Sequence, residues 1–417
     1  MADVVRAKYR IESWFSLEDA AEFIAGEQSS GTFVAVPGES KELKERYRAR
    51  VVAIEPLAPQ AQPSLPGAQR PPGAEKVNAG EVTIEWPLHN FGPSLPNLLA
   101  AVGGNLFELR ELAGIRLLDL ELPEAFVQRY PGPRFGVTGT RRLMNVPSGI
   151  MVGTIVKPSI GLEPEQLRPI VRELVDAQID FIKDDELIAD PPYSPLAERV
   201  RVVMEEIERG AQRTGQRTMY AFNITDDVDH LPRHYETLMR AGANCAMICI
   251  NLVGFAGVAY LRSFCDLPIH GHRTFIGALM REPSLGVDFV AFQKLARLAG
   301  VDHLHTGGMK NKFYETDDAI QRSVEAVRRP FLGGYSCLPV LSSAQTAATM
   351  PLTWERLRTD DVLVVAGGGI HAHPAGRAAG VRSLRRAWEA ATRGESLDEA
   401  AKRDEELAQA LDRFARV

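Results

Sequence analysis

From about residue 130 onward, the chain alternates short apolar segments with longer amphipathic ones, and this alternation restricts the fold more than any other feature. It is typical of βα units on a parallel sheet. Helical segments such as 164–178 and 288–300 separate most of the strands. About eight such units close a (β/α)₈ TIM barrel, and no GxGxxG follows the first strand to favour an open sheet. Strands are expected at 149–157, 179–185, 218–224, 245–251, 267–272, 301–306, 337–342 and 362–369.

The part of the chain before the barrel has a different pattern. Strands follow one another there as often as they alternate with helices, which indicates a small α+β domain of ferredoxin-like type. Residues 58–76 are rich in Pro, Ala and Gly and are expected to form a loop. We predict two domains, 1–128 and 129–417. The first would contain strands at 4–13, 48–57, 81–88 and 115–123, and helices at 16–29 and 94–109.

Composition excludes several classes of partner. The net charge of −6 argues against nucleic acid or an anionic membrane as the main partner. The N-terminus lacks the apolar core of a signal peptide, and the longest apolar window, 245–261, is too short to cross a bilayer. We therefore expect a cytoplasmic protein. Its four cysteines form no CxxC and lie mostly in apolar runs, so free buried thiols are expected at Cys245, Cys249, Cys265 and Cys337, with a disulfide as the less favoured alternative.

Polar residues stand at the C-terminal ends of nearly all the predicted barrel strands, where barrel enzymes place their active sites. One polar residue at a strand end is more often a rim or capping group. A run across most of the barrel instead converges on one mouth. The run comprises Lys157, Lys183, Asp185, Glu186, Asn223, Asn251, His270, His272, Arg273, His303, His305, Ser342, Gly367, Gly368 and Gly369.

The segment DFIKDDELIAD (180–190) ends a buried strand in a lysine and three acids. Side chains alternate along a strand, so Lys183 and Asp185 would share one face and Asp184 would point the other way. Asp185 and Glu186 are hard oxygen donors suited to Mg²⁺. Lys183 cannot ligate a cation while protonated, but addition of CO₂ to its neutral amine would give an anionic carbamate. Taken alone, the segment is explained more simply by an ion-paired lysine.

Three further segments suggest anion binding. Arg273 follows an HxH pair in PIHGHRTF (268–275); HxH ligates metal in many hydrolases, whereas the guanidinium suits phosphate or carboxylate. Three glycines at 367–369 would bind phosphate through backbone N–H groups, or form only a tight turn. The segment HTGGMKNKFYE (305–315) resembles a lid that closes over an anionic substrate, although a solvated basic loop explains it better when taken alone.

Together these segments resemble, in order and spacing, the active-site segments of the RuBisCO large subunit. Segments of the first domain agree: 26–33 is similar to the family's N-terminal substrate loop, and 103–123 to its conserved helix and strand. The resemblance covers nearly the whole chain. In the barrel it rests on segments 153–162, 180–186, 270–275, 302–312 and 367–376.

The resemblance implies a role for each matching residue. Lys183 would be a carbamylated lysine that completes a Mg²⁺ site with Asp185 and Glu186. Lys157 would be the acid/base lysine near an enolate, and His272 would lie beside the metal-bound oxygens. One anionic end of a sugar phosphate would be bound by Arg273, His305 and Ser342, and the other by Gly367, Gly368, Thr32 and Lys312, with Asn223 also at the substrate. The minimal active unit would be a homodimer. Four residues of each subunit would reach into the barrel of its partner: Glu27, Thr32, Phe33 and Asn105.

Several positions depart from the carboxylase pattern. Ser159 replaces the second lysine of KPK, and Ile276 replaces the histidine expected after the HR pair. Ser343 and Ala344, in LSSAQ, stand where the carboxylase has the glycines of a Ser-Gly-Gly phosphate loop, and Phe33 replaces a tryptophan. These losses, with the metal site complete, resemble the RuBisCO-like proteins of form IV. Such proteins share metal-assisted enolate formation but do not fix CO₂.

The expected activity is therefore a Mg²⁺-dependent carbon–carbon lyase acting on a phosphorylated, sugar-derived keto acid. The lid pattern is similar to that of decarboxylases and transcarboxylase/hydrolases of 3-oxo sugar-acid phosphates such as 3-oxo-isoapionate 4-phosphate. Alternatives are the methionine-salvage 2,3-diketo-5-methylthiopentyl-1-phosphate enolase and the 5-methylthioribulose-1-phosphate isomerase. A catalytically idle regulatory homologue would not need a costly buried charged cluster. A true carboxylase is opposed by Ser159 and Ile276.

Overall fold

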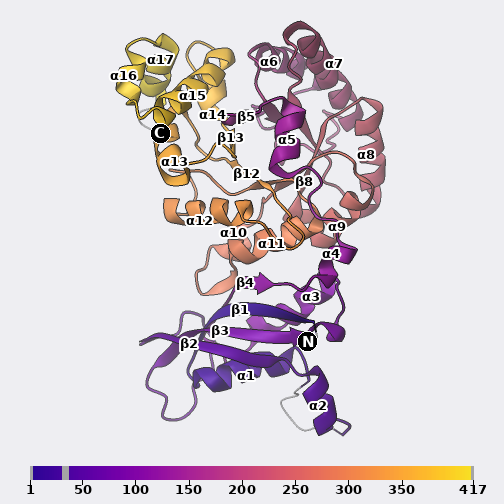
Figure 1. Ribbon diagram of the computed structural model, residues 1–417, viewed down its shortest axis with the longest axis vertical. Coiled ribbons are helices and arrows are strands. Elements are labelled where there is room, and N and C mark those ends of the chain that lie inside the picture. Colours follow the sequence, from indigo (N-terminus) through magenta and orange to yellow (C-terminus); the bar gives the residue numbers. More distant parts are fainter. Residues whose placement is uncertain (1–2, 31–36, 415–417) are drawn as a thin grey trace. The chain divides into compact units, whose positions relative to one another are not determined.

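A computed structural model describes residues 3–30 and 37–414 (Figure 1). Thr32 and Phe33 lie outside the described residues. The chain divides into two compact units, and each is treated by itself below. The first comprises Met1–Pro131, Phe275–Leu298 and Phe331–Gly334, and the second comprises Gly132–Thr274, Ala299–Pro330 and Tyr335–Val417.

The first unit is built on a five-stranded sheet of order β10-β4-β1-β3-β2. Strand β1 pairs antiparallel with both β3 and β4, and the short β10 adds parallel to β4. The order β4-β1-β3-β2 is that of the ferredoxin-like arrangement, so the expected α+β class is confirmed. The elements are β1 (Val4–Ser13), α1 (Leu17–Glu27), α2 (Lys41–Tyr47), β2 (Arg50–Gln60), β3 (Val77–Pro87), α3 (Leu95–Val102), β4 (Gly114–Glu121), α4 (Ala125–Arg129), α10 (Gly277–Met280), β10 (Leu285–Val287) and α11 (Phe289–Ala299).

Local sequence explains most of these boundaries. Alternate residues of β1 are buried, as expected of a strand with one face on a core. Ser16 caps α1 by accepting a hydrogen bond from the Asp19 N–H. The helix expected over 94–109 is broken, because α3 ends at Val102 and a short 3₁₀ turn, η2 (Leu106–Glu108), follows. Gly104 lies between them with φ of 34°, and a Cβ there would lie 2.5 Å from the Ala100 carbonyl oxygen.

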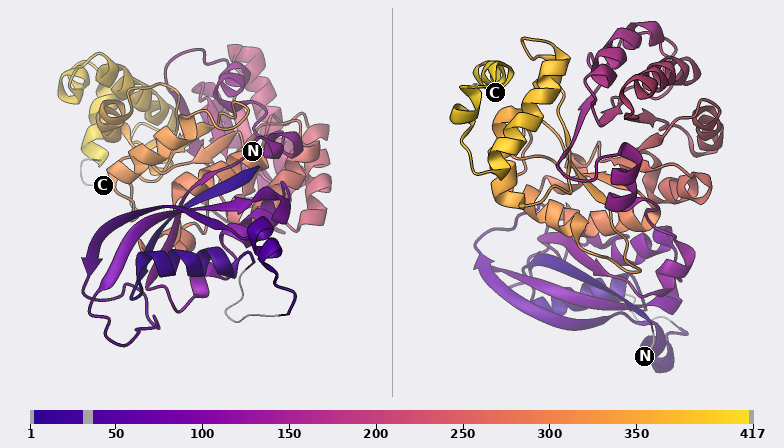
Figure 2. Two further views of the ribbon diagram at one scale, coloured as in Figure 1. Left: turned by 60° about the horizontal axis from the view of Figure 1, so that its bottom comes forward. Right: turned by 45° about the horizontal axis from the view of Figure 1, so that its top comes forward.

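The second unit contains a closed barrel in which each strand pairs in parallel with its neighbours (Figure 2). All eight expected strands are present, each shorter than its predicted range. This confirms the (β/α)₈ architecture. The strands are β5 (Met151–Ile155), β6 (Phe181–Lys183), β7 (Met219–Asn223), β8 (Cys245–Cys249), β9 (Ile269–His272), β11 (His303–His305), β12 (Leu338–Leu341) and β13 (Leu363–Val365).

In two places the predicted strand range runs into a helix. Ile250 and Asn251 begin helix α9, and Gly368 and Gly369 begin α14, because the ladders to the neighbouring strands have ended and the chain turns at once. The helices of this unit surround the strands (Figure 2). They are α5 (Gly136–Met144), α6 (Pro164–Asp176), α7 (Leu196–Thr214), α8 (Leu231–Arg240), α9 (Ile250–Phe264), α12 (Asp317–Arg328), α13 (Met350–Leu357), α14 (Gly368–His371), α15 (Arg377–Thr392), α16 (Leu397–Ala401) and α17 (Glu405–Phe414).

The barrel interior is a packed apolar core. Successive side chains of a strand point to opposite faces, so every second residue points inward. Continuing the same alternation beyond the core brings Lys157, Lys183, Asp185, Asn223 and Ser342 inward at the C-terminal ends of their strands. The core side chains are Met151, Phe181, Met219, Ala221, Cys245, Met247, Cys249, Leu338, Val340, Leu363 and Val365, together with Met144 from α5.

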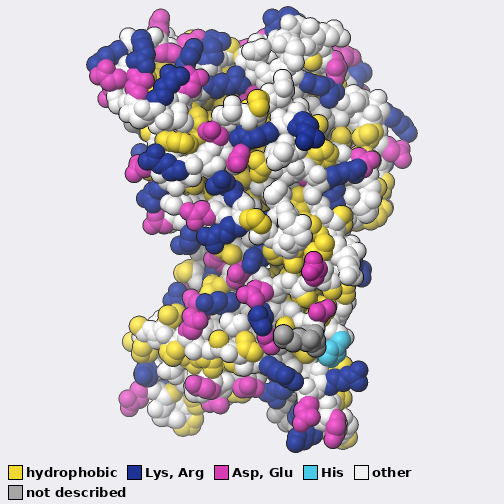
Figure 3. Space-filling view, viewed as in Figure 1, with side chains coloured by type: hydrophobic (Ala, Val, Ile, Leu, Met, Phe, Trp, Pro, Cys, Tyr) yellow, Lys and Arg dark blue, Asp and Glu magenta, His cyan; other side chains and the backbone are white. Residues whose placement is uncertain are grey.

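Two further expectations concern the chain as a whole. All four cysteines are free and buried, as predicted. Within residues 3–30 and 37–414, no helix combines the length and the apolar character needed to cross a bilayer. Side chains of both charge signs intermingle over α16 and α17 in the space-filling view (Figure 3), where ion pairs such as Lys402–Glu399 and Arg403–Glu395 form.

Candidate active site at the barrel mouth

Lys183 ends β6 and is completely buried. Its Nζ donates a hydrogen bond to the Asp184 carbonyl oxygen at 2.7 Å and lies 4.0 Å from Glu186 Oε2. Burial lowers the pKa of Lys183, against the opposing attraction of Glu186 and Asp185. Burial therefore makes the neutral amine, the form that reacts with CO₂, more accessible than it is in an exposed lysine.

Asp185, two residues after Lys183, contacts Lys157. Asp185 Oδ2 accepts a hydrogen bond from Lys157 Nζ at 2.7 Å, and the same Nζ donates to Ser159 Oγ at 2.6 Å. Burial opposes ionisation of Asp185, but the hydrogen bond from Lys157 helps to lower its pKa below the ordinary value. The substituted position Ser159 thus contacts the expected acid/base lysine directly.

Asp184 points the other way, as the alternation predicted. Its carboxylate accepts hydrogen bonds from the Tyr220 hydroxyl at 2.7 Å, Arg199 Nε at 3.2 Å and the Asn223 N–H at 2.9 Å. Arg199 is itself buried and also donates to the Ser194 carbonyl. Both oxygens of Asp184 are therefore used in holding β6, β7 and α7 together.

Asn223, expected to contact substrate, uses its side chain on the backbone of the acidic segment. Its amide N–H₂ donates to the carbonyls of Asp185 at 3.2 Å and Glu186 at 3.3 Å, and its carbonyl accepts from Thr225. This geometry gives Asn223 a positioning role, because it fixes the turn that carries both candidate metal ligands.

Three histidines form the opposite side of the mouth. His272 Nδ1 accepts the Thr274 N–H at 3.2 Å, so in its neutral form the proton is on Nε2, 3.6 Å from Glu186 Oε2. His305 contacts His270 through Nε2 at 2.8 Å and Ser342 Oγ through Nδ1 at 2.9 Å. Burial lowers the pKa of all three rings, which keeps them neutral.

Arg273 is already paired. Its guanidinium makes a two-pronged contact with Glu315, with Nη1 2.8 Å from Oε1 and Nη2 bonded to Oε2. The guanidinium of Arg273, expected from sequence to bind an anion, is thus paired with the carboxylate of Glu315, 42 residues away. Sequence reasoning did not single out Glu315. The only signal for Glu315 was its place at the end of the glycine-rich segment 305–315.

The first residues of segment 305–315 are buried and held by contacts with neighbouring elements. Gly307 has φ of 84°, and a Cβ there would lie 2.4 Å from Ile320 Cδ1, so glycine is required. The Gln345 amide donates to the Met309 carbonyl at 3.0 Å. Lys312 is exposed, and its backbone N–H donates to Ser343 Oγ at 3.3 Å. Only the second half of this segment presents basic side chains to solvent.

Glycines follow β13, and two non-glycine residues with glycine-like backbone angles follow β12. Gly367 precedes α14, and a Cβ there would lie 3.6 Å from Lys157 Cε, whereas one on Gly368 would meet nothing within 4 Å. Ser343 and Ala344 have φ of 76° and 53°, a region that favours glycine. The backbone thus keeps a glycine-like shape where the sequence has lost the glycines expected there.

The candidates from the first domain are described only within their own unit. Glu27 ends α1 and Asn105 precedes η2, and both are exposed. They belong to the first unit, whereas every barrel candidate belongs to the second. The structure thus gathers the barrel candidates and leaves the roles of Glu27 and Asn105 as predictions.

Comparison with known proteins agrees with this architecture. The family model for the ribulose bisphosphate carboxylase large chain, catalytic domain, matches residues 136–414, and the model for its N-terminal domain matches residues 2–126.

Individual relatives match over nearly the full length. A 3-oxo-isoapionate-4-phosphate transcarboxylase/hydrolase from Xanthobacter autotrophicus is 46% identical, with 99% of each chain covered. A 3-oxo-isoapionate-4-phosphate decarboxylase from Rhizobium etli is 42% identical, again with 99% of each covered. The crystal structure of a rubisco-like protein from Burkholderia fungorum superposes with a TM-score of 0.91 at 42% identity, covering 98% of this chain and 99% of that one. On these matches, the chain belongs to the ribulose bisphosphate carboxylase large-chain family.

Proposed function

We propose that the protein is a carbon–carbon bond-cleaving enzyme whose substrate is a 3-oxo sugar-acid phosphate of the 3-oxo-isoapionate 4-phosphate type. The observation that carries the proposal is the cluster at the barrel mouth, in which Lys157 Nζ lies 2.7 Å from Asp185 beside the buried Lys183. The two full-length relatives at 46% and 42% identity, whose names specify this substrate, support it.

The donor set fits a divalent cation. Asp185 and Glu186 supply carboxylate oxygens, and the Lys183 amine, 4.0 Å from Glu186 Oε2, would complete the set as a carbamate. Such an all-oxygen set suits Mg²⁺. When bound, Mg²⁺ would polarise the substrate carbonyl and stabilise the negative charge that develops on its oxygen.

The remaining steps are carried by the chain's own residues. Cleavage of the C–COO⁻ bond moves its electron pair toward the 3-oxo group and releases the carboxyl carbon. Lys157, held between Asp185 and Ser159, then delivers a proton to the carbon left behind. His272 presents an N–H to the same region. Gly367 and Gly368 with Lys312 would bind one anionic end of the substrate, and Arg273 with His305 and Ser342 the other.

The test is turnover of 3-oxo-isoapionate 4-phosphate labelled with ¹³C in its carboxyl group, with Mg²⁺ and bicarbonate present and followed by NMR. A decarboxylase releases the label as CO₂, whereas a transcarboxylase/hydrolase keeps it in an acid product. Either result supports the proposal. Absence of turnover here, combined with turnover of a methionine-salvage phosphate, would refute it.

We further propose a homodimer in which Glu27 and Asn105 of one protomer complete the barrel mouth of the other. Both side chains are exposed, which leaves them available to a second copy of the chain. Light scattering should give twice the chain mass. Glu27→Gln should reduce turnover without dissociating the dimer, and mixing it with Lys183→Ala should restore activity to part of the population. A monomer with full activity would contradict this assembly.

A further inference from the structure

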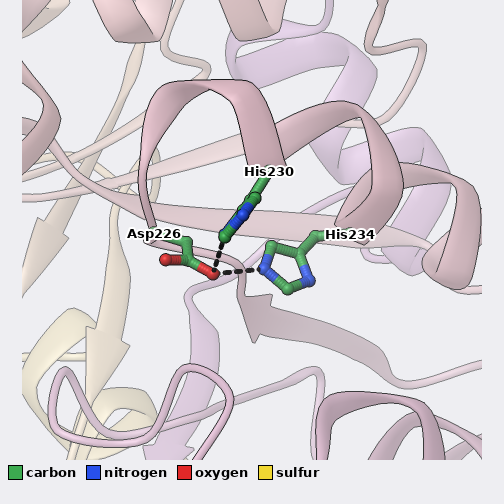
Figure 4. A group of neighbouring side chains, drawn as sticks. All are labelled: Asp226, His230 and His234. Atoms are coloured by element: carbon green, nitrogen blue, oxygen red, sulfur yellow. Dashed lines mark hydrogen bonds and ion pairs between the residues drawn. The ribbon is translucent and has the colours of Figure 1, made fainter.

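Apart from the mouth, three side chains able to ligate a metal converge just after β7 (Figure 4). Asp226 lies in the loop, His230 ends the short 3₁₀ turn η3 (Val228–His230), and His234 lies in α8. Asp226 Oδ2 is 3.1 Å from His230 Nδ1 and 2.7 Å from His234 Nε2. One ligand atom of each residue lies within 4.8 Å of the other two.

These separations are close to those of a metal site. Two ligands about 2.1 Å from a tetrahedral ion lie about 3.4 Å apart, so small movements would seat an ion among the three atoms. The two histidines are four residues apart and meet at one carboxylate, as Figure 4 shows. We propose that Asp226, His230 and His234 bind Zn²⁺, independently of the Mg²⁺ site proposed at the mouth.

The carboxylate is oriented for this role. The Asp227 N–H donates to Asp226 Oδ1 at 2.8 Å, which leaves Oδ2 facing both rings. The His234 side chain is only 4% exposed, whereas that of His230 is 43% exposed. The site thus has one firmly held ligand and one solvent-facing side, where water can supply a fourth ligand. The exposed Asp227 and Asp229 add negative charge nearby.

The donor types select the ion. Two imidazoles and one carboxylate suit Zn²⁺, whereas Mg²⁺ prefers oxygen ligands and retains water. In the metal-free protein each ring would donate its proton to Oδ2. Zn²⁺ binding moves that proton to the opposite nitrogen of each neutral ring, which is a modest tautomeric change, and replaces two hydrogen bonds by coordination.

The position of the proposed Zn²⁺ site indicates that the ion would have a structural role. The loop that carries Asp226 starts from Asn223, whose amide holds the carbonyls of Asp185 and Glu186. Thr225 donates to Asn223 Oδ1 and accepts the Cys249 N–H. An ion at Asp226, His230 and His234 would fasten η3 and α8 to this loop, so it would stabilise the segment next to the mouth without contacting substrate.

Co²⁺ replaces Zn²⁺ in such sites and reports its coordination by visible absorption, so it is the probe for the test. Metal-free protein in excess Mg²⁺ should bind one equivalent of Co²⁺ with the absorption of a four-coordinate site, and Zn²⁺ should displace it. His230→Gln and His234→Gln should each weaken binding at least tenfold. His89→Gln, which changes an exposed histidine elsewhere, is the matched control and should bind as the parent protein does.

Lys183→Ala separates this site from the mouth, because it should retain Co²⁺ binding whether or not the proposed function is correct. As a second measurement, Zn²⁺ should raise the thermal midpoint by a few degrees in the parent protein and in Lys183→Ala, but not in Asp226→Asn. Equal binding by His230→Gln and the parent protein, or loss of binding in Lys183→Ala alone, would overturn the proposal. His230 is exposed enough that its variant should fold even if His234→Gln does not.

Discussion

The two ends of the barrel use buried charge in opposite ways. At the N-terminal end, Asp302 precedes β11 and is completely buried. Its Oδ2 accepts hydrogen bonds from Arg262 Nη1 at 3.0 Å and the Ile269 N–H at 2.9 Å, and its Oδ1 accepts from the N–H groups of Phe135 and Gly136. Each of the two carboxylate oxygens of Asp302 thus accepts two hydrogen bonds.

At the C-terminal end Asp184 and Arg273 are paired, but two other buried side chains, Lys183 and His270, have fewer partners than they can use. Lys183 Nζ has one short hydrogen bond within the described residues, and His270 Nδ1 has none there. An unpaired buried polar group is costly, so a fold that keeps such groups gains something else from them. The difference indicates that pairing at the N-terminal end of the barrel, called the closed end below, serves stability. Incomplete pairing at the mouth leaves groups available for ligands.

The largest expected effect follows from removing the amine at the mouth. Lys183→Met should lower kcat/KM by about 10⁴-fold, because it removes the proposed metal ligand, while stability stays equal or rises as an underpaired buried amine is replaced by an apolar chain. Turnover and thermal unfolding of the same sample test both parts. A large loss of stability would place Lys183 with the structural charges of the other end.

The opposite result is expected at the closed end. Asp302→Asn should destabilise the fold by about 3–5 kcal/mol, because it leaves the buried Arg262 uncompensated. The turnover number per folded molecule should hardly change. Denaturant unfolding and active-site titration give the two quantities. If kcat fell while unfolding was unaffected, the proposed division between the two ends would be wrong.

Lys157 sharpens the comparison within the mouth. Lys157→Met should reduce turnover by about 10²-fold, the usual contribution of a positioned acid or base. Ser159→Ala is the matched control, because it removes the 2.6 Å contact to Lys157 Nζ and keeps the lysine. We expect Ser159→Ala to shift the pH profile and to lower kcat by no more than a few fold. Equal losses in both variants would assign the proton transfer to the pair.

The smallest effect concerns Glu206, a buried carboxylate on α7, in the helical layer outside the barrel strands. Hydrogen bonds led by that from Arg172 lower the pKa of Glu206 to about 2, against an ordinary value of 4.5. The folded-state pKa is below the unfolded one, so the stabilisation is complete above pH 4.5 and is lost as the pH falls toward 2. Glu206→Gln should cost about 1–3 kcal/mol at pH 7 and much less near pH 2.5. A cost independent of pH, measured by urea unfolding, would contradict the ionic origin.

Sequence periodicity was enough to predict the barrel because its signal is local. Eight apolar segments with helical separators, and polar residues continuing each strand, place the mouth cluster without any long-range information. The alternation along a strand also predicted the opposite orientations of Lys183 and Asp184. The ends of elements were less predictable, as Asn251 and Gly368 show, because a strand ends where its neighbour's ladder ends.

Pairings between distant segments could not be predicted in this way. Arg273 and Glu315 are 42 residues apart, and their contact depends on how β9 and the segment after β11 approach in the folded barrel. Likewise, the four-residue spacing of His230 and His234 is visible in the sequence, but the approach of Asp226 depends on the turn made by η3. Such contacts are products of tertiary structure and leave no periodic signal.

The backbone at Ser343 and Ala344 has a wider consequence. A non-glycine residue in that left-handed region costs roughly 1 kcal/mol, so this loop holds a shape that glycine would adopt with less strain. Glycine at either position would relieve this strain. The main chain of the turn can therefore take up the glycine pattern of a phosphate loop by side-chain substitution alone.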